Sequence, residues 1–261
     1  MKHLFCLLLL CLALPTQAAL SLIALDVGEG QALLLKQEDR GILIDTGHPG
    51  MARHVLDRLQ NLGIKHLDYL ILTHLHPDHA GGYFRLREAF PETPVLYSGH
   101  PLPKDVRPDL TRWVNEALLH DPHRRTIGAG KTFIWQGITL TFLWPEHFTG
   151  NNLNRHSLVL LLEAKGRQIL VMGDADKKVE QALLMSKHLP SRIDVLVVGH
   201  HGAADASSPA FIDRIHPLQA IISVNRNNIR GYPSAEVIRR MENAGIKVLR
   251  TDLLGEIRID F

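Results

Sequence analysis

The sequence has only two cysteines, Cys6 and Cys11, and both fall in an apolar run, residues 4–14, close to the N-terminus. A basic start, a short hydrophobic stretch and small residues after it are typical of a secretory signal peptide, with a buried N-terminal helix as the alternative. We therefore expect residues 1–18 to be a signal peptide and residues 19–261 to be exported, either to the periplasm or as a secreted protein. That exported chain has no cysteine, which excludes thiolate metal ligands, a thiol nucleophile and disulfides.

The sequence also lacks a second long hydrophobic run and a large net charge of either sign. After the N-terminal run, no apolar stretch reaches the roughly 20 residues that a membrane-spanning helix needs, so we expect no integral membrane segment after signal cleavage. The chain has 29 Lys and Arg against 27 Asp and Glu. This near balance does not by itself indicate nucleic acid as a partner, and nothing in the composition indicates a protein partner.

The sequence contains no internal repeat, and short β-branched apolar segments alternate with helical patterns. The apolar segments predict strands at residues 20–27, 31–36, 41–47, 67–74, 139–145, 157–164, 168–174, 193–200 and 218–224. The helical patterns predict helices at residues 50–62, 176–187, 208–215 and 234–244. We interpret residues 99–131, which are rich in Pro, Arg and His, as a long surface excursion with one helix near 109–119 and as a candidate flap over the site.

The spacing of these segments favours a two-sheet architecture. The first three strands follow one another closely, as in an antiparallel meander, whereas the later ones alternate with helices. Several strands are apolar at nearly every position, which is expected where both faces of a sheet are buried. Two sheets packed face to face with helices outside fit this pattern better than a doubly wound parallel sheet.

Residues 72–82, LTHLHPDHAGG, place metal-ligand side chains at the end of a buried strand. His74 and His76 are two residues apart, so on an extended chain they point the same way. Pro77 then breaks the strand and suits the first turn of a helix, which sends Asp78 and His79 in another direction. Four ligand side chains from two directions suit a pair of metal ions, although a solvated histidine-rich loop is the alternative.

Two more strands end in residues of the same kind. QILVMGD ends at Asp174, and IDVLVVGHHG ends with His200 and His201. A carboxylate has two oxygens, so Asp174 can bridge two ions, whereas a lone aspartate at a strand end would favour a turn. Because histidine and carboxylate ligation without thiolate suits Zn²⁺ and accepts Mn²⁺, we expect two divalent ions of one of these kinds.

HLHPDH at 74–79 matches the HxHxDH motif of the metallo-β-lactamase superfamily. The order of DVGEG (26–30), ILIDTG (42–47), HLHPDH, SLVL (157–160), VMGD (171–174), VVGHHG (197–202) and RTDLLGEI (250–257) resembles the hydrolase domain of ComEC/Rec2-type competence proteins. The resemblance covers residues 20–259 and implies an α/β fold, a four-layer αββα sandwich with the metals at the edge of its sheets. It implies one hydrolase domain, residues 19–261. The membrane helices of the competence channel are absent from this sequence, so we expect a stand-alone, exported relative.

The resemblance also implies roles for individual residues. Six positions match metal ligands: His74 and His76 for the first ion, Asp78 and His79 for the second, Asp174 as the bridge, and His201 as the last ligand. His200 is the alternative to His201 and otherwise a neighbour or substrate contact. Asp45 matches a strand-end aspartate that either supports the ligands or forms a turn.

Other positions depart from the superfamily or from this subgroup. Many superfamily members have a further histidine ligand where the competence subgroup has Asn and Ser. Asn154 and Ser157 fit the subgroup here, and His156 is a ligand, a proton donor or a surface histidine. The subgroup often has Gln and Asp where this chain has Glu29 and Gln31, and it often has His where this chain has Tyr232. These positions are candidates for substrate contact.

Together these features predict an exported metal-dependent hydrolase, first of all a phosphodiesterase or DNase. Two ions about 3.5–4 Å apart lower the pKa of a water between them towards 7 and make it a nucleophile. We expect Asp78 to bind metal and handle the proton, and His200, His156 or Asn154 to meet the leaving group or the phosphate.

DNA or another phosphodiester is the expected partner. Basic residues that are candidates for phosphate contacts, or simply a solvated surface, are Arg107, Arg112, Arg124, Arg125, Lys131, Arg226 and Arg230. One alternative is a hydrolase of a small ester, lactam or phosphorylcholine-type substrate on the same metals. Another is a DNA- or metal-binding module without turnover. Steep weakening of binding with salt would indicate DNA.

Overall fold

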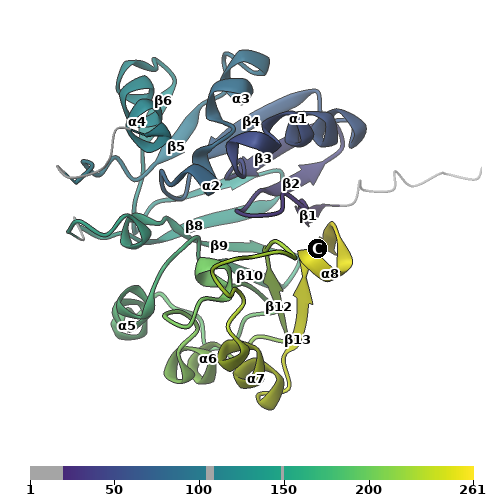
Figure 1. Ribbon diagram of the computed structural model, residues 1–261, viewed down its shortest axis with the longest axis vertical. Coiled ribbons are helices and arrows are strands. Elements are labelled where there is room, and N and C mark those ends of the chain that lie inside the picture. The colour runs from purple at the N-terminus through teal and green to yellow at the C-terminus, as the bar shows by residue number, and fades with distance from the viewer. Residues whose placement is uncertain (1–19, 104–108, 148–149) are drawn as a thin grey trace, which may run out of the picture.

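Two β-sheets packed face to face form the centre of the computed structural model, which describes residues 20–103, 109–147 and 150–261 (Figure 1). The predicted signal peptide and Arg107 lie outside the described residues. The first sheet contains, in spatial order, β14 (Ile257–Asp260), β1 (Ser21–Ala24), β2 (Leu33–Gln37), β3 (Arg40–Ile44), β4 (His66–Ile71), β5 (Val95–Tyr97) and β6 (Arg124–Thr126). The second contains β13 (Lys247–Arg250), β12 (Gln219–Ile222), β11 (Val195–Val197), β10 (Arg167–Val171), β9 (Val159–Ala164), β8 (Ile138–Trp144) and β7 (Thr132–Trp135).

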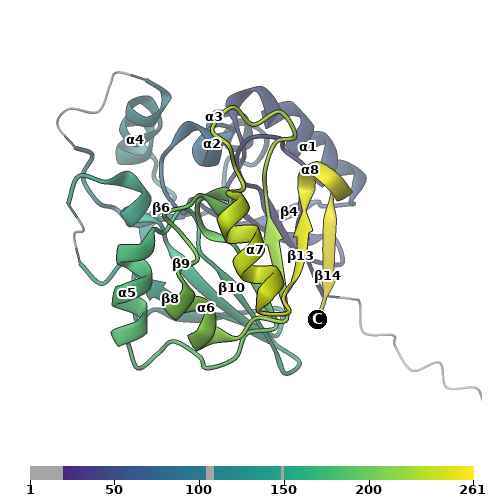
Figure 2. The ribbon, with the colours of Figure 1, turned by 60° about the horizontal axis from the view of Figure 1, so that its bottom comes forward.

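Helices cover the outer face of each sheet (Figures 1 and 2). Those on the first sheet are α1 (Ala52–Asn61), α2 (Pro77–Ala80), α3 (Tyr83–Ala89) and α4 (Leu110–His120), and those on the second are α5 (Lys177–Met185), α6 (Pro209–Ile215) and α7 (Ala235–Asn243). The short α8 (Thr251–Leu254) leads from β13 of the second sheet to β14 of the first. The αββα sandwich expected from the sequence is confirmed. None of the helices in the described ranges has both the length and the apolar character to span a bilayer.

The alternation of side chains along each strand explains why so many strands are apolar throughout. On β1, Leu22 and Ala24 point into the core between the two sheets, whereas Ile23 points into the core under the helices of the first sheet. On β9, Leu160 and Leu161 divide in the same way between the central core and the core under the second helix layer. Both of these strands are therefore buried on both faces, as their sequences predicted.

Every predicted strand and helix is present, with ends that shift by a few residues. The helical turn expected at Pro77 is α2, whereas the sequence interpretation missed seven short strands and α-helices: β5, β6, β7, β13, β14, α3 and α8. The described parts of residues 99–131 contain a helix and a strand of the fold rather than only a surface excursion. α4 buries Val114 and Leu118 against the first sheet layer, and β6 pairs in parallel with β5 as the edge strand. The helix that we expected within a flap therefore belongs to the outer helix layer.

Parallel pairing brings the carboxyl ends of strands from both sheets to one edge of the sandwich. β3 and β4 are parallel in the first sheet, and β10, β11 and β12 are parallel in the second. The chain leaves these strands towards the same edge, and there it carries the ligand residues predicted from the sequence.

Candidate metal centre

The histidine motif follows β4 directly and runs into α2. Pro77 occupies the first position of that four-residue helix, and His76, which precedes it, is extended with φ −62° and ψ 149°. Thr46 holds the helix in place, because its backbone N–H and its hydroxyl both donate to the carbonyl of His79. Asp78 and His79 are both buried.

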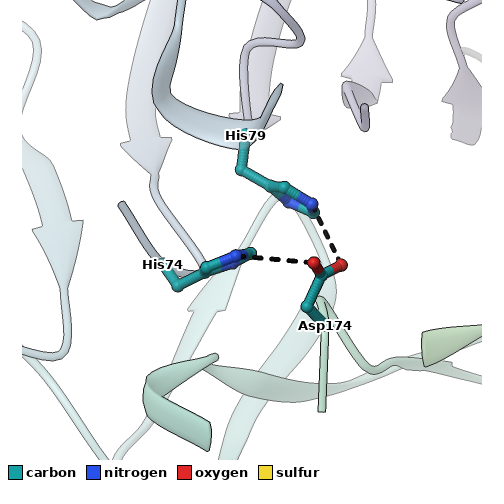
Figure 3. Close-up of side chains that lie close together, drawn as sticks. All are labelled: His74, His79 and Asp174. Atoms are coloured by element: carbon teal, nitrogen blue, oxygen red, sulfur yellow. Dashed lines mark ion pairs between the residues drawn. The ribbon is translucent and has the colours of Figure 1, made fainter. Parts of the chain in front are cut away.

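Five buried side chains, hereafter the ligand cluster, converge at the sheet edge: His74, Asp78, His79, Asp174 and His201. They form two groups, His74–His79–Asp174 and Asp78–His79–His201, and within each group the potential ligand atoms lie within 4.8 Å of one another. Figure 3 shows His74 and His79, from the first half of the chain, facing Asp174 from the second. Nε2 of His79 lies 3.0 Å from Oδ1 of Asp174, and Nε2 of His74 lies 3.6 Å from Oδ2.

The Nδ1 atoms of two of these histidines already form hydrogen bonds. Nδ1 of His201 donates to the carbonyl of Ser223 at 2.9 Å, and Nδ1 of His79 lies 2.7 Å from Oδ2 of Asp45. Because both oxygens only accept, each Nδ1 carries a proton, and a neutral ring then presents a lone pair at Nε2. The two Nε2 atoms face each other at 3.2 Å. Without a metal, a proton on one of these nitrogens makes the contact a hydrogen bond, and a bound cation would replace that proton.

The carboxylates of the cluster are also positioned to bind cations. Oδ1 of the buried Asp174 lies 3.0 Å from Nε2 of His79 and 3.4 Å from Nε2 of His201. Oδ2 of Asp78 lies 3.6 Å from the same nitrogen. Buried carboxylate oxygens and imidazole nitrogens that converge in this way suit divalent cations, so the residues present fit the expected metals.

Neighbouring charges shift the pKa values of the cluster strongly. Burial favours neutral Asp174, but His79, His201 and His74 hold the pKa of its carboxyl well below the usual value. Burial opposes a charged His79, yet the carboxylates of Asp174 and Asp45 raise its pKa well above 6.5. Burial and the neighbouring His79 lower the pKa of His74 well below 6.5. The cluster therefore favours positive charge at its centre, which a divalent ion supplies.

Asp45 organises one side of the cluster. It is fully buried, has φ +61°, and accepts hydrogen bonds from the backbone and hydroxyl of Thr73, from Gln31 and from His79. Of the two roles expected for Asp45, contact with a ligand histidine is therefore observed. Gln31 was expected to be a candidate for substrate contact, and this was wrong: its side chain is buried and holds Asp45 at 2.8 Å.

The two neighbouring histidines at 200 and 201 point in different directions. Both have left-handed backbone conformations, with φ +50° and +53°, within the 3-10 helix η3 (Gly199–Gly202). His201 enters the ligand cluster, whereas Nδ1 of His200 lies 2.9 Å from Oδ1 of Asp205. Nε2 of His200 lies at the rim, 3.3 Å from the hydroxyl of Tyr232 and 3.3 Å from Nδ2 of Asn154. Asp205 follows no motif that the sequence analysis could use.

The remaining predicted residues divide between the edge of the cluster and positions away from it. Nδ1 of His76 lies 2.9 Å from Nε2 of His74, and Ser157 accepts from the backbone N–H of Asp174 at 3.0 Å. His156 is not a surface histidine: it is 3% exposed, belongs to neither ligand group, and its Nε2 donates to the carbonyl of Gly150 at 2.7 Å. It lies in η2 (Leu153–His156).

The predicted basic residues are dispersed rather than gathered in one patch. Arg124 and Arg125 are exposed on the edge strand β6, and Arg226 donates to the carbonyl of Asp252. Arg230 lies at the cluster, with Nη1 3.7 Å from Oδ2 of Asp78.

Known proteins resemble this chain over most of its length. The model of the metallo-beta-lactamase superfamily matches residues 25–224. The chain is 33% identical over 242 residues to recombination protein 2 of Haemophilus influenzae, 31% identical over 236 residues to competence protein ComA of Neisseria gonorrhoeae, and 30% identical over 259 residues to ComE operon protein 3 of Bacillus subtilis. These matches cover 91%, 89% and 90% of this chain but only 28%, 31% and 32% of the relatives.

Solved structures share the fold at low sequence identity. The metallo-beta-lactamase fold protein YhfI from Bacillus subtilis aligns with a TM-score of 0.59 and 13% identity, over 93% of this chain and 100% of its own. Igni18, a metallo hydrolase from Ignicoccus hospitalis, aligns with a TM-score of 0.60 and 14% identity, over 92% and 99%. The resemblance seen in the sequence motifs is thus confirmed: the chain belongs to the metallo-β-lactamase superfamily, whose members are generally metal-dependent hydrolases, and is related to the competence proteins.

Proposed function

We propose that the protein is an exported phosphodiesterase that cleaves DNA with the help of two divalent metal ions. The observation that carries the proposal is the ligand cluster itself, in which two groups of potential ligands lie side by side and the two oxygens of Asp174 face different histidines. Two such groups beside one carboxylate suit a pair of close ions, the arrangement that serves phosphodiester cleavage. The relatives named for recombination and competence, which match about nine-tenths of the chain, support DNA as the substrate.

The residues of the site have separate roles in the proposed reaction. His74, His76, Asp78, His79, Asp174 and His201 would hold the ions, which when bound would activate water and neutralise charge on a phosphate. Asp45 keeps the proton of His79 on Nδ1 and so keeps Nε2 free for a metal. Asp174 presents one oxygen towards His74 and the other towards His79 and His201, as a bridging ligand does.

Polar groups at the rim are positioned to receive the substrate. Nδ2 of Asn154, the hydroxyl of Tyr232 and Nε2 of His200 lie within hydrogen-bond distance of one another and can meet phosphate or leaving-group oxygens. Asp78 is ionised at neutral pH, because His201 and the charge of His79 lower the pKa of its carboxyl despite burial. It is therefore in the form that binds metal.

The test is nuclease activity of residues 19–261 on single- and double-stranded DNA with added Zn²⁺ or Mn²⁺. We expect cleavage that needs metal and that is lost in Asp78→Asn. Asp68→Asn is the matched control, because Asp68 accepts its hydrogen bonds from Arg40 and Trp135 rather than from the cluster. A protein that binds two ions per chain but cleaves only small esters or lactams would refute the proposal. Mass spectrometry of the N-terminus in the exported fraction tests cleavage after residue 18.

A further inference from the structure

One arginine reaches the ligand cluster from a loop of the second half of the chain. Arg230 lies between β12 and α7, and its Nη1 is 3.7 Å from Oδ2 of Asp78. Its Nη2 is 3.3 Å from Oε1 of Glu29, which belongs to the loop after β1 in the first half. The Arg230 side chain is 51% exposed, whereas that of Asp78 is 10% exposed. The guanidinium therefore lies between the buried cluster and solvent, beside a carboxylate from the opposite half.

Local hydrogen bonds hold Arg230 in this position. Oδ1 of Asn228 accepts from the backbone N–H of Arg230 at 2.8 Å and from that of Tyr232 at 3.2 Å. The ring of Tyr232 stacks on His201, with centroids 6.4 Å apart and planes at 21°. Arg226 in the same loop is directed elsewhere, with both Nε and Nη2 donating to the carbonyl of Asp252. The loop thus directs only one of its two arginines to the cluster.

The charges around Arg230 indicate an anionic ligand. Two divalent ions would neutralise the carboxylates of Asp45, Asp78 and Asp174, and a bound ion would engage the carboxylate of Asp78 in place of Arg230. Arg230 would then face solvent with Glu29 as its remaining counter-ion. The planar fork of arginine matches two oxygens of a phosphate, so a phosphate would compete with Glu29 for the same donors.

We infer that Arg230 is the phosphate-binding residue that determines the specificity of the site, and that Glu29 is its competing counter-ion. The ligand is a phosphodiester, whose phosphate is negatively charged, in preference to a neutral ester. This inference rests on the proposed phosphodiesterase function and adds the residue pair that recognises the substrate. It predicts that substitution of Arg230 lowers kcat/KM on a phosphodiester and that substitution of Glu29 raises it.

The test compares kcat/KM of the metal-loaded protein on bis(p-nitrophenyl) phosphate and on p-nitrophenyl acetate. A hydrogen bond to a charged group corresponds to about 10–100-fold, so we expect Arg230→Gln to lower kcat/KM on the phosphodiester by that factor. We expect Glu29→Gln to raise it by roughly 3–10-fold, because the competing carboxylate is gone, and the double variant to resemble Arg230→Gln. Activity on the neutral ester should stay within about twofold. Arg226→Gln is the control and should resemble the wild type on both substrates.

Binding of a labelled thymidine oligonucleotide with phosphorothioate linkages gives a readout that does not depend on turnover. Each phosphate contact to a single strand adds about 0.7 to the slope of log K against log salt concentration, so Arg230→Gln should lower this slope by about that amount. If Arg230→Gln equals the wild type in slope and in kcat/KM, the inference is wrong. It is also wrong if both single variants lose activity and melting temperature together, as for a purely structural ion pair. A wild-type protein that cleaves no phosphodiester, yet binds the oligonucleotide through Arg230, would instead refute the proposed function alone.

Discussion

Replacing Asp45 with asparagine changes one atom of a buried side chain and, with it, the position of the proton on His79. Oδ2 of Asp45 accepts from His79, Gln31 and the hydroxyl of Thr73, and Oδ1 accepts from the backbone N–H of Thr73, all at 2.7–2.8 Å. An amide has only one acceptor oxygen, so its NH₂ group faces either the Thr73 N–H or the His79 N–H. In the second case His79 must move its proton to Nε2, and the ligand cluster loses a lone pair.

The expected magnitude follows from this change of tautomer. Loss of a partner that orients a ligand histidine weakens metal binding by about 10–100-fold, or roughly 1.4–2.7 kcal/mol. One buried donor without an acceptor adds a loss of about 1–3 kcal/mol in the free energy of unfolding of the metal-free protein. The backbone itself tolerates the change, because asparagine is among the residues that adopt a φ near the +61° of Asp45. Competition with a chromogenic chelator measures metal affinity, and urea unfolding measures stability.

A matched substitution separates the metal effect from the stability effect. Asp68 on β4 accepts from Trp135 at 2.7 Å and from Arg40, outside the ligand cluster. Asp68→Asn should lower stability and leave metal affinity unchanged, whereas Asp45→Asn should lower both. If Asp45→Asn binds metal as tightly as the wild type while unfolding more easily, Asp45 acts only as a turn residue and our reasoning on the tautomer is wrong.

Three other substitutions, the first with a control variant, test parts of the site and the fold. In Gly30→Ala the new Cβ would lie 2.0 Å from the carbonyl oxygen of Asp78, so metal content and melting temperature should fall together. Gly28→Ala is the control: its Cβ would have no atom within 4 Å, so the variant should lose only about 1–2 kcal/mol in the free energy of unfolding and keep its metal. Asp205→Asn frees the ring of His200, and we expect kcat to fall about tenfold with metal content unchanged. Burial favours neutral Asp121, but bonds from Tyr83, His123 and Arg87 lower the pKa of its carboxyl, so Asp121→Asn should cost about 2–4 kcal/mol at pH 7. Asp121 stabilises the fold only while its carboxyl is ionised. The difference in free energy of unfolding between wild type and Asp121→Asn, measured with urea, should therefore shrink as the pH falls below about 4.

The sequence predicted those parts of the fold whose burial leaves a periodic signal. Strands such as β9 and β10 are apolar at nearly every position because one face packs on the other sheet and the next face packs under helices. β6 has no such signal: its residues Arg124–Thr126 are all exposed, and pairing with β5 alone makes them a strand. β14 alternates buried and exposed residues over Ile257–Asp260, but four residues are too few to recognise without their neighbour β1.

The sequence predicted the convergence of candidate ligands that lie close together in the chain and, through the family resemblance, of Asp174 and His201. It did not predict features that depend on the local backbone conformation. The spacing of His74, Asp78 and His79 was enough to place them together. Positive φ values at both His200 and His201 turn the two rings apart, and no spacing rule reveals such a turn. Residues that hold the ligands, such as Asp205, come from loops whose path depends on the finished fold.

His79 links the two halves of the site because each of its ring nitrogens faces a different part of the molecule. Nδ1 is fixed by Asp45 at the end of β3, in the first sheet. Nε2 faces Asp174 and His201, which follow β10 and β11 in the second sheet. An ion bound at Nε2 therefore connects residues that otherwise meet only when the sheets are packed together. Because the unfolded chain lacks this convergence, metal binding must stabilise the packing of the two sheets, by an amount that grows with the logarithm of metal concentration over its dissociation constant.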